Sequence, residues 1–123
     1  DKGYTGSVGY VGSQGIYGPR NISFQRPVNG DTQTLMYTDK QVTIGEVRSV
    51  ISGGTSADLS LKFDSDRSST GTTIMSSTVV NLSSGTTATL SNATVQANRW
   101  IWAEVGTIAD SVQELSVNVR FNE

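Results

Sequence analysis

Residues 114–121, ELSVNVRF, alternate apolar and polar side chains without interruption. Successive side chains of a β-strand point to opposite faces of its sheet. One face of this stretch is therefore apolar and consists of Leu115, Val117, Val119 and Phe121. The opposite face is polar and consists of Ser116, Asn118 and Arg120. A strand that packs one face on a core and turns the other to water is typical of an antiparallel sheet.

The same alternation recurs in residues 58–63, DLSLKF, where Leu59, Leu61 and Phe63 share one face. In residues 42–51, VTIGEVRSVI, the apolar parity instead slips on passing Gly45. A glycine at a change of parity is typical of a β-bulge, which inserts one extra residue into a strand. We therefore predict a bulge at Gly45.

From Asn21 onward the chain is rich in Ser, Thr, Val, Ile and Leu, and no segment sustains a helical period. Turn residues such as Asn29-Gly30-Asp31 and Ser52-Gly53-Gly54 separate the apolar stretches. The predicted strands are 21–26, 33–38, 42–51, 58–63, 74–82, 86–91, 99–106 and 113–122. The expected fold is all-β, a sandwich or jelly roll of roughly eight antiparallel strands. The strand count leaves open which of these arrangements forms.

Residues 1–20, DKGYTGSVGYVGSQGIYGPR, carry glycine at every third position: Gly3, Gly6, Gly9, Gly12, Gly15 and Gly18. Three polyproline-II-like chains can wind together only where the residue on the axis has no side chain. The register thus predicts a collagen-like Gly-X-Y stalk over 1–20, with these glycines on the axis. The β domain over 21–123 would then hold three copies together. A flexible linker, or glycine-lined helices packed within one chain, are the alternatives.

Residues 99–105, RWIWAEV, have two faces that could be buried. Ile101, Ala103 and Val105 share one face, while Trp100 and Trp102 share the other. The tryptophans could cap the core or fill a second layer, or they could lie in a contact between subunits. Alternatively, two aromatic residues on one side of a strand could form a stacking platform for a sugar ring.

Asp64 and Asp66 stand at alternate positions in FDSDR, with Arg67 beside them. The carboxylates could offer oxygen ligands to calcium, but the glycine and distal glutamate of an EF-hand loop are missing. A solvated turn with Arg67 as the counter-charge is the favoured interpretation, so we expect no metal.

The composition argues against several classes of function. The formal net charge is −2, and the nine basic residues form no basic stripe, so we expect no nucleic-acid partner. The chain has no cysteine and no histidine, which argues against disulfides, most zinc sites and every His-dependent triad. No apolar run is long enough to insert in a membrane. No catalytic motif is present, so we expect neither an enzyme nor a cofactor.

The run GYTGSVGYVGSQG, followed by YTDKQVTIGEVRSVI, FDSDRSSTGT, RWIWAEVGT and a terminal ELSVNVRF, resembles virion appendage proteins of bacteriophages, particularly of marine and cyanobacterial phages. In such proteins, GYTGS-type repeats form collagen-like stalks that precede a compact β domain. The resemblance implies a homotrimeric structural protein on the virion surface, in a tail fibre, a head fibre or a capsid decoration. It also implies synthesis in the host cytoplasm, which agrees with the lack of cysteine.

Two classes of function remain open at this point. In the first, the β domain is a fibre tip that adsorbs to a bacterial surface polysaccharide or protein. Asp64, Asp66 and Arg67, or exposed Trp100 and Trp102, would then make the contacts. In the second, the domain only trimerises the stalk or anchors it to other virion proteins. A glycan-cleaving enzyme is disfavoured because it usually needs a longer chain and a carboxylate pair in a cleft.

Overall fold

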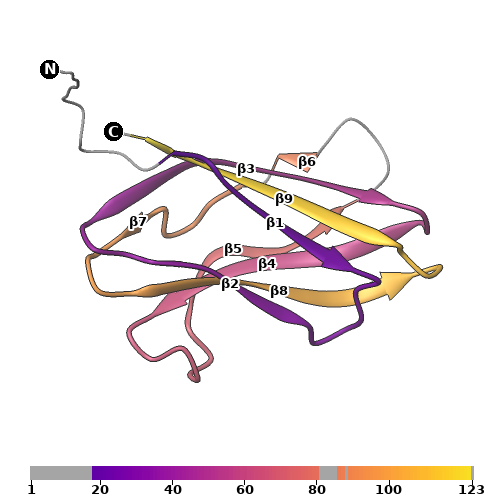
Figure 1. Cartoon of the computed structure of the whole chain (residues 1–123), viewed down its shortest axis with the longest axis horizontal. Coiled ribbons are helices and arrows are strands. Elements are labelled where there is room, and N and C mark those ends of the chain that lie inside the picture. Colours follow the sequence, from indigo (N-terminus) through magenta and orange to yellow (C-terminus); the bar gives the residue numbers. More distant parts are fainter. Residues whose placement is uncertain (1–17, 81–85, 88, 123) are drawn as a thin grey trace, which may run out of the picture.

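The computed structural model describes residues 18–80, 86–87 and 89–122, and this part of the chain is all-β (Figure 1). Nine strands form two antiparallel sheets, and the described residues contain no helix. None of these residues therefore belongs to an apolar helix of membrane-spanning length. The strands are β1 (Arg20–Gln25), β2 (Thr32–Tyr37), β3 (Val42–Ser52), β4 (Ser56–Asp64), β5 (Thr72–Val80), β6 (Thr86–Thr87), β7 (Thr94–Val95), β8 (Trp100–Ala109) and β9 (Glu114–Asn122).

The two sheets lie in separate layers, and the first sheet lies above the second in Figure 1. The first sheet has the order β1-β9-β3, and the short strands β6 and β7 both pair with β3. The second sheet has the order β2-β8-β4-β5. The first strand therefore pairs with the last and β2 with β8, while β4 pairs with its neighbour in sequence, β5. This nested pairing is the strand order of a jelly roll.

The alternation predicted from the sequence matches the burial of side chains in β4 and β9. Leu59 and Leu61 are completely buried in β4, and Leu115, Val117 and Val119 are buried in β9. They form one apolar core between the sheets, which Ile101, Ala103 and Val105 of β8 extend. The bulge at Gly45 is also confirmed, because Ile44 pairs with Phe121 while Glu46 pairs with the adjacent Arg120. Gly45 is thus the extra residue.

The strand predicted over 86–91 is wrong in its extent. Only Thr86 and Thr87 form a strand, residue 88 lies outside the described part of the chain, and Ser91 is not in a strand. The reason is that this segment crosses between the sheets. The Ser91 amide donates to the Ile74 carbonyl in β5 at 2.7 Å, and the Ala93 carbonyl accepts from the Ile44 amide in β3 at 2.8 Å. The expected strands do not include β7, so the described residues form nine strands rather than roughly eight.

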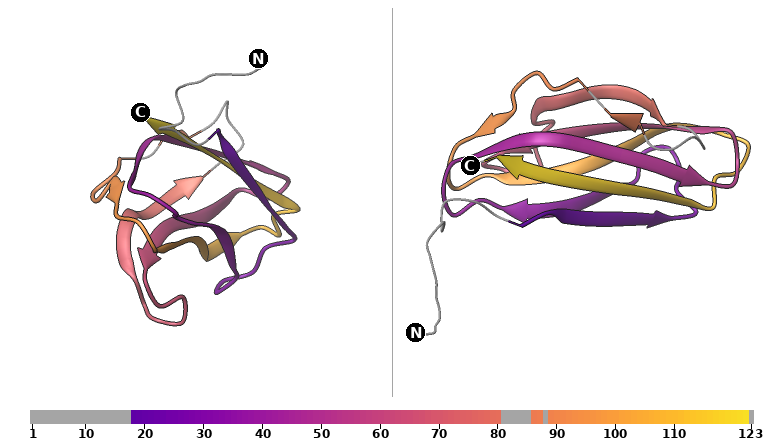
Figure 2. Two further views of the ribbon diagram at one scale, coloured as in Figure 1. Left: turned by 60° about the vertical axis from the view of Figure 1, so that its left-hand side comes forward. Right: turned by 90° about the horizontal axis from the view of Figure 1, so that it is seen from above.

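The sandwich has two distinct poles (Figures 1 and 2). At one pole, called the terminal pole here, β1 begins and β9 ends. The far pole carries the connections from β1 to β2, from β3 to β4 and from β8 to β9. The predicted axial glycines from Gly3 to Gly15 lie outside the described residues. Gly18 precedes β1 with open space around it, so the stalk stays a prediction.

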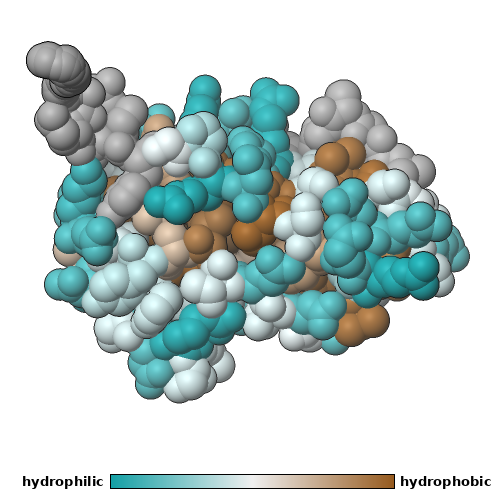
Figure 3. Space-filling model, in the orientation of Figure 1, coloured by the Kyte–Doolittle hydropathy of each residue, from teal (hydrophilic) through white to brown (hydrophobic). Residues whose placement is uncertain are grey.

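The edge strands β1 and β2 contact each other along one margin of the two sheets. On this face an apolar strip, brown in Figure 3, is surrounded by hydrophilic residues. Ile22 of β1 and Leu35 of β2 are partly buried against the core. The Gln33 side chain spans the two sheets, because its Nε2 atom donates to the Ser23 carbonyl oxygen at 2.6 Å. The Gln33 side chain therefore satisfies one backbone acceptor of the edge strand β1. This makes that edge less available for pairing with a strand of another chain.

Candidate functional site

The outer face of the second sheet brings together the residues predicted from sequence. Tyr37, Trp100 and Asp64 lie opposite one another across β2, β8 and β4. In a neighbouring row, Thr34 and Lys62 flank Trp102. Both tryptophans point away from the core because they alternate with Ile101 and Ala103. The loop between β4 and β5 carries Arg67 onto this face, and the same loop contains Asp66.

Trp102 is completely buried although it lies outside the main core. The Arg67 guanidinium carbon is 4.6 Å from the centre of its ring. A Cβ atom added at Gly71 would come within 2.7 Å of the same ring, so the backbone of the β4–β5 loop is in close contact with it. The indole Nε1 donates to Glu104 Oε2 at 2.9 Å. Trp102 therefore fills a small second layer between the sheet and this loop, and its ring is not presented to solvent.

Arg67 links the β4–β5 loop to the edge strand β2 of the same sheet. Its Nε donates to Thr34 Oγ1 at 2.9 Å, and its Nη2 donates to Thr32 Oγ1 at 3.1 Å. Both threonines belong to the edge strand β2. Because Arg67 lies across Trp102, it forms no ion pair with Asp64 or Asp66 within the described part of the chain. The expectation that Arg67 serves as their counter-charge is therefore wrong.

The two aspartates instead stabilise their own turn. Asp64 Oδ1 accepts the Asp66 amide at 2.9 Å, and Asp66 Oδ1 accepts both the Ser68 amide at 2.9 Å and the Ser68 hydroxyl at 2.7 Å. The hydrogen bond from the Asp66 amide is the main cause that lowers the pKa of Asp64. The hydrogen bond from the Ser68 hydroxyl is the main cause that lowers the pKa of Asp66. Among residues 18–80, 86–87 and 89–122, no three acidic side chains converge as a metal site would require.

Trp100 differs from Trp102 because it is only partly buried. Its neighbour Tyr37 is 42% exposed, and the two ring centres lie 4.8 Å apart with 58° between their planes. The Tyr37 hydroxyl lies 3.5 Å from Asn98 Oδ1. Sequence reasoning missed Tyr37 and Asn98 as site residues. The alternation in residues 33–38 places Tyr37 on a strand, but only the pairing of β2 with β8 brings it against Trp100.

Thr38, which is completely buried, holds this end of the site in place. Its hydroxyl donates to the Gln96 carbonyl at 2.8 Å and accepts the Arg99 amide at 2.9 Å. Its carbonyl accepts the Asn98 amide at 2.7 Å. Asn98 has φ +63°, a left-handed conformation that asparagine adopts more readily than most residues. These hydrogen bonds fix the backbone around Asn98.

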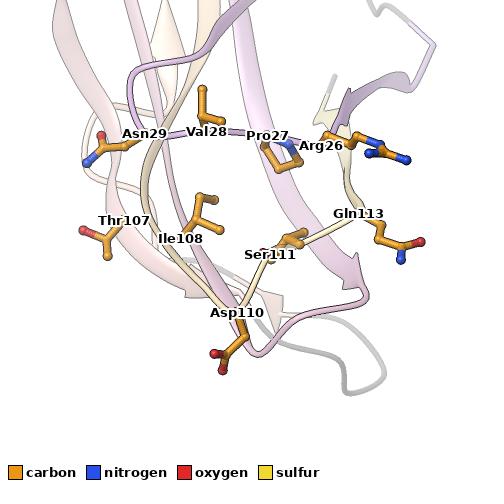
Figure 4. Close-up of a pocket in the computed structure, with 10 residues that line it drawn as sticks. Arg26, Pro27, Val28, Asn29, Thr107, Ile108, Asp110, Ser111 and Gln113 are labelled. Atoms are coloured by element: carbon orange, nitrogen blue, oxygen red, sulfur yellow. The ribbon is translucent and has the colours of Figure 1, made fainter.

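A separate groove lies at the far pole and has a volume of about 760 Å³ (Figure 4). The connections on either side supply Pro27 and Val28 on one wall and Ile108, Asp110 and Ser111 on the other. None of the residues singled out from the sequence lines it. It contains no aromatic side chain, so it offers no stacking surface.

Comparisons with known proteins add little to this geometry. No protein-family model matches the sequence, and no curated protein matches it. Among solved structures, a chain in the "Structure of infectious bursal disease virus Gx strain" aligns with a TM-score of 0.39 and 11% sequence identity. The alignment covers 81% of this chain and 30% of that chain, so this chain spans about a third of the length of the viral one. At this level the match carries no argument about function.

Proposed function

We propose that this chain is a virion appendage protein whose β domain forms the tip of a homotrimeric fibre on the virion surface. The observation that carries the proposal is the uninterrupted glycine register from Gly3 to Gly18, directly before β1. Such a register needs three chains, and a compact domain of stable fold is what would hold them in register. The resemblance to phage appendage proteins supports the same assignment.

The fibre tip would adsorb to a bacterial surface through the outer face of the second sheet. This face carries a partly exposed aromatic pair, Tyr37 and Trp100, with polar groups at its margin. Asp64 and Trp100 lie toward the terminal pole, whereas Arg67 reaches along the sheet to Thr32, so contact would be made through the side of the domain. Contact would not be made from the pole opposite the start of β1.

A purely structural module, which trimerises or anchors the stalk without binding a receptor, is the second candidate. The burial of Trp102 favours it, because that ring stabilises its own domain and is not available to a receptor. Both candidate functions imply synthesis in the host cytoplasm and assembly with other virion proteins.

The mass of the native assembly tests the proposal. We would measure it by light scattering for the full chain and for a shortened chain that begins at Gly18. Two trimers would support a trimerising β domain that templates the stalk. A trimer of the full chain with a monomer of the shortened chain would assign trimerisation to the glycine run. Two monomers would overturn the fibre-tip proposal.

A further inference from the structure

We infer that Tyr37 and Trp100, together with Asp64 and Asn98, form a binding site for a neutral saccharide. These four residues are called the aromatic rim. The inference deepens the proposed adsorption function, and its biological meaning depends on that function. The binding itself depends only on the geometry of one domain.

The two rings supply an aromatic surface that is partly open to solvent. Tyr37 is 42% exposed and Trp100 is partly exposed, and their planes meet at 58° and not in a flat stack. The pair thus forms an angled aromatic surface in which Tyr37 is the more exposed ring. One face of a pyranose ring carries mainly C–H groups, which lose unfavourable contact with water when they cover an aromatic ring.

The margin of the rim supplies partners for sugar hydroxyls. Asp64 lies opposite Trp100 across β8 and β4 and is only partly buried. Its carboxylate already accepts hydrogen bonds from the amides of Ser65 and Asp66 and from the hydroxyls of Ser65 and Ser69, so a sugar hydroxyl would share these oxygens with the turn. On the other side, the exposed Asn98 amide offers two N–H donors. A few polar groups around an apolar surface are what small-molecule sites use to orient a ligand.

The rim is rigid before ligand binding, which lowers the entropic cost of association. The buried Thr38 hydroxyl bonds to Gln96 and Arg99, and the Thr38 carbonyl bonds to Asn98. The Arg99 guanidinium also donates to the carbonyls of Ala97 and Asn98, at 3.0 and 3.2 Å. Asp64 is fixed by the Asp66 amide.

Charge and size select a neutral saccharide over other ligands. Asp64 and Asp66 on one side and the Arg99 guanidinium on the other give the rim no excess of positive charge that would attract a phosphate backbone or an acidic sugar. A stable protein interface covers about 800 Å² on each partner. Two aromatic residues bury only about 150–250 Å² each even when they are fully covered, and polar groups surround this pair. The rim is therefore large enough for a sugar and too small to hold a protein alone.

The two tryptophans make the test simple, because Trp102 is buried and Trp100 lies in the rim. The full chain would be titrated with the neutral trisaccharides maltotriose, mannotriose and chitotriose, and with tri-galacturonate as the acidic probe. We expect a saturable change of tryptophan fluorescence with at least one neutral trisaccharide, and a response to tri-galacturonate at least about tenfold weaker. The absence of a saturable response to any neutral trisaccharide would overturn the inference.

Calorimetric titration of variants then assigns the site. Trp100→Ala and Tyr37→Ala should each weaken binding by about tenfold or more, in line with the loss of a central contact residue. Tyr37→Phe keeps the ring and should bind nearly as the natural chain does. Val79→Ala, at an exposed apolar residue elsewhere, is the matched control and should leave binding unchanged. Equal binding by Trp100→Ala and the natural chain would overturn the assignment.

Light scattering on the same samples separates this inference from the proposed function. A monomer that binds a neutral trisaccharide through Trp100 would support the rim and contradict the fibre tip. A trimer that binds no neutral trisaccharide would support the fibre tip and contradict the saccharide site. If Trp100→Ala breaks a trimer into monomers, the rim is a contact between subunits and the saccharide inference is wrong.

Discussion

The Arg67 guanidinium carbon lies over the Trp102 ring, 4.6 Å from its centre, and holds the β4–β5 loop against the outer face of the second sheet. The same side chain reaches across to Thr32 and Thr34 on the edge strand β2. A single arginine therefore joins the β4–β5 loop, the central strand β8 and the edge of the sheet. Its contacts bury a tryptophan that the main core does not reach.

Arg67→Ala should lower the free energy of unfolding by about 1–3 kcal/mol. The variant loses a cation–π contact that is strengthened by desolvation, together with two side-chain hydrogen bonds. It should also shift the tryptophan emission to longer wavelength, because Trp102 becomes exposed. Urea unfolding and fluorescence spectra measure both effects. Arg48→Ala is the control, since Arg48 is an exposed partner of Glu46 and should cost about 0–1 kcal/mol. Equal losses in the two variants would contradict the role given to Arg67.

Gly71→Ala should be more destabilising than Gly30→Ala. Both glycines have positive φ, +79° and +100°, so alanine strains the backbone by about 1–2 kcal/mol at either position. Only at Gly71 would the new Cβ come within 2.7 Å of the Trp102 ring, whereas Gly30 faces open space. Because Trp102 is fully buried and cannot move away freely, we expect a further cost of about 1–3 kcal/mol. Thermal unfolding of the two variants measures the difference, and equal costs would show that the loop adjusts.

Thr38→Val should cost about 1–3 kcal/mol although it hardly changes the shape of the side chain. The substitution leaves the Gln96 carbonyl and the Arg99 amide without the Thr38 hydroxyl. Thr38→Ser keeps the hydroxyl and loses only a methyl group, so it should retain more of the bonding energy. Urea unfolding compares the two. A serine variant less stable than the valine variant would mean that packing, and not hydrogen bonding, is the main role of Thr38.

Stability should fall on acidification as Asp64 and Asp66 become protonated. Hydrogen bonds in the folded state hold both pKa values below the ordinary value of 3.8. The unfolded chain therefore binds protons first, and the stabilisation is fully present above about pH 4. It is lost as the pH falls through the lower pKa values of the folded state. Urea midpoints measured between about pH 5 and about pH 3 should show this decline.

Two variants test which groups cause the acid dependence. The double variant Asp64→Asn, Asp66→Asn removes both titrating groups and should flatten the decline. Ser68→Ala removes the hydroxyl that chiefly lowers the pKa of Asp66, so it should weaken the decline while keeping every carboxylate. An unchanged slope in both variants would assign the acid dependence to other residues.

The alternation of side chains was enough to predict most of the sandwich. Leu115, Val117 and Leu59 are buried as their positions in the strands require, because one face of each strand must cover a common core. The bulge at Gly45 could also be predicted from the sequence, because one extra residue changes which alternate positions of β3 are apolar. The pairing of β1 with β9 was not readable from sequence, because a strand carries little local information about a partner so distant in the chain.

The site was less predictable than the fold. Trp100 and Trp102 occupy equivalent positions in the alternation, yet one is partly exposed and the other is buried. The difference comes from Arg67 and Gly71, which a loop distant in sequence brings over Trp102. Tyr37 meets Trp100 only through strand pairing. The sequence around each tryptophan contains no hydrophobic periodicity or motif that would predict these contacts with Arg67, Gly71 or Tyr37.

The position of β1 determines how the domain would bear mechanical load. β1 is an edge strand that begins at the terminal pole and runs along the sandwich, and among the described strands it pairs only with β9 (Figure 1). A force that pulls Arg20 away along this axis acts parallel to the strand and across all six residue pairs from Arg20↔Val119 to Gln25↔Glu114 at once. The hydrogen bonds between the two strands run perpendicular to that pull. They would therefore resist it together in shear and would not open one after another, which suits a domain held by its first strand.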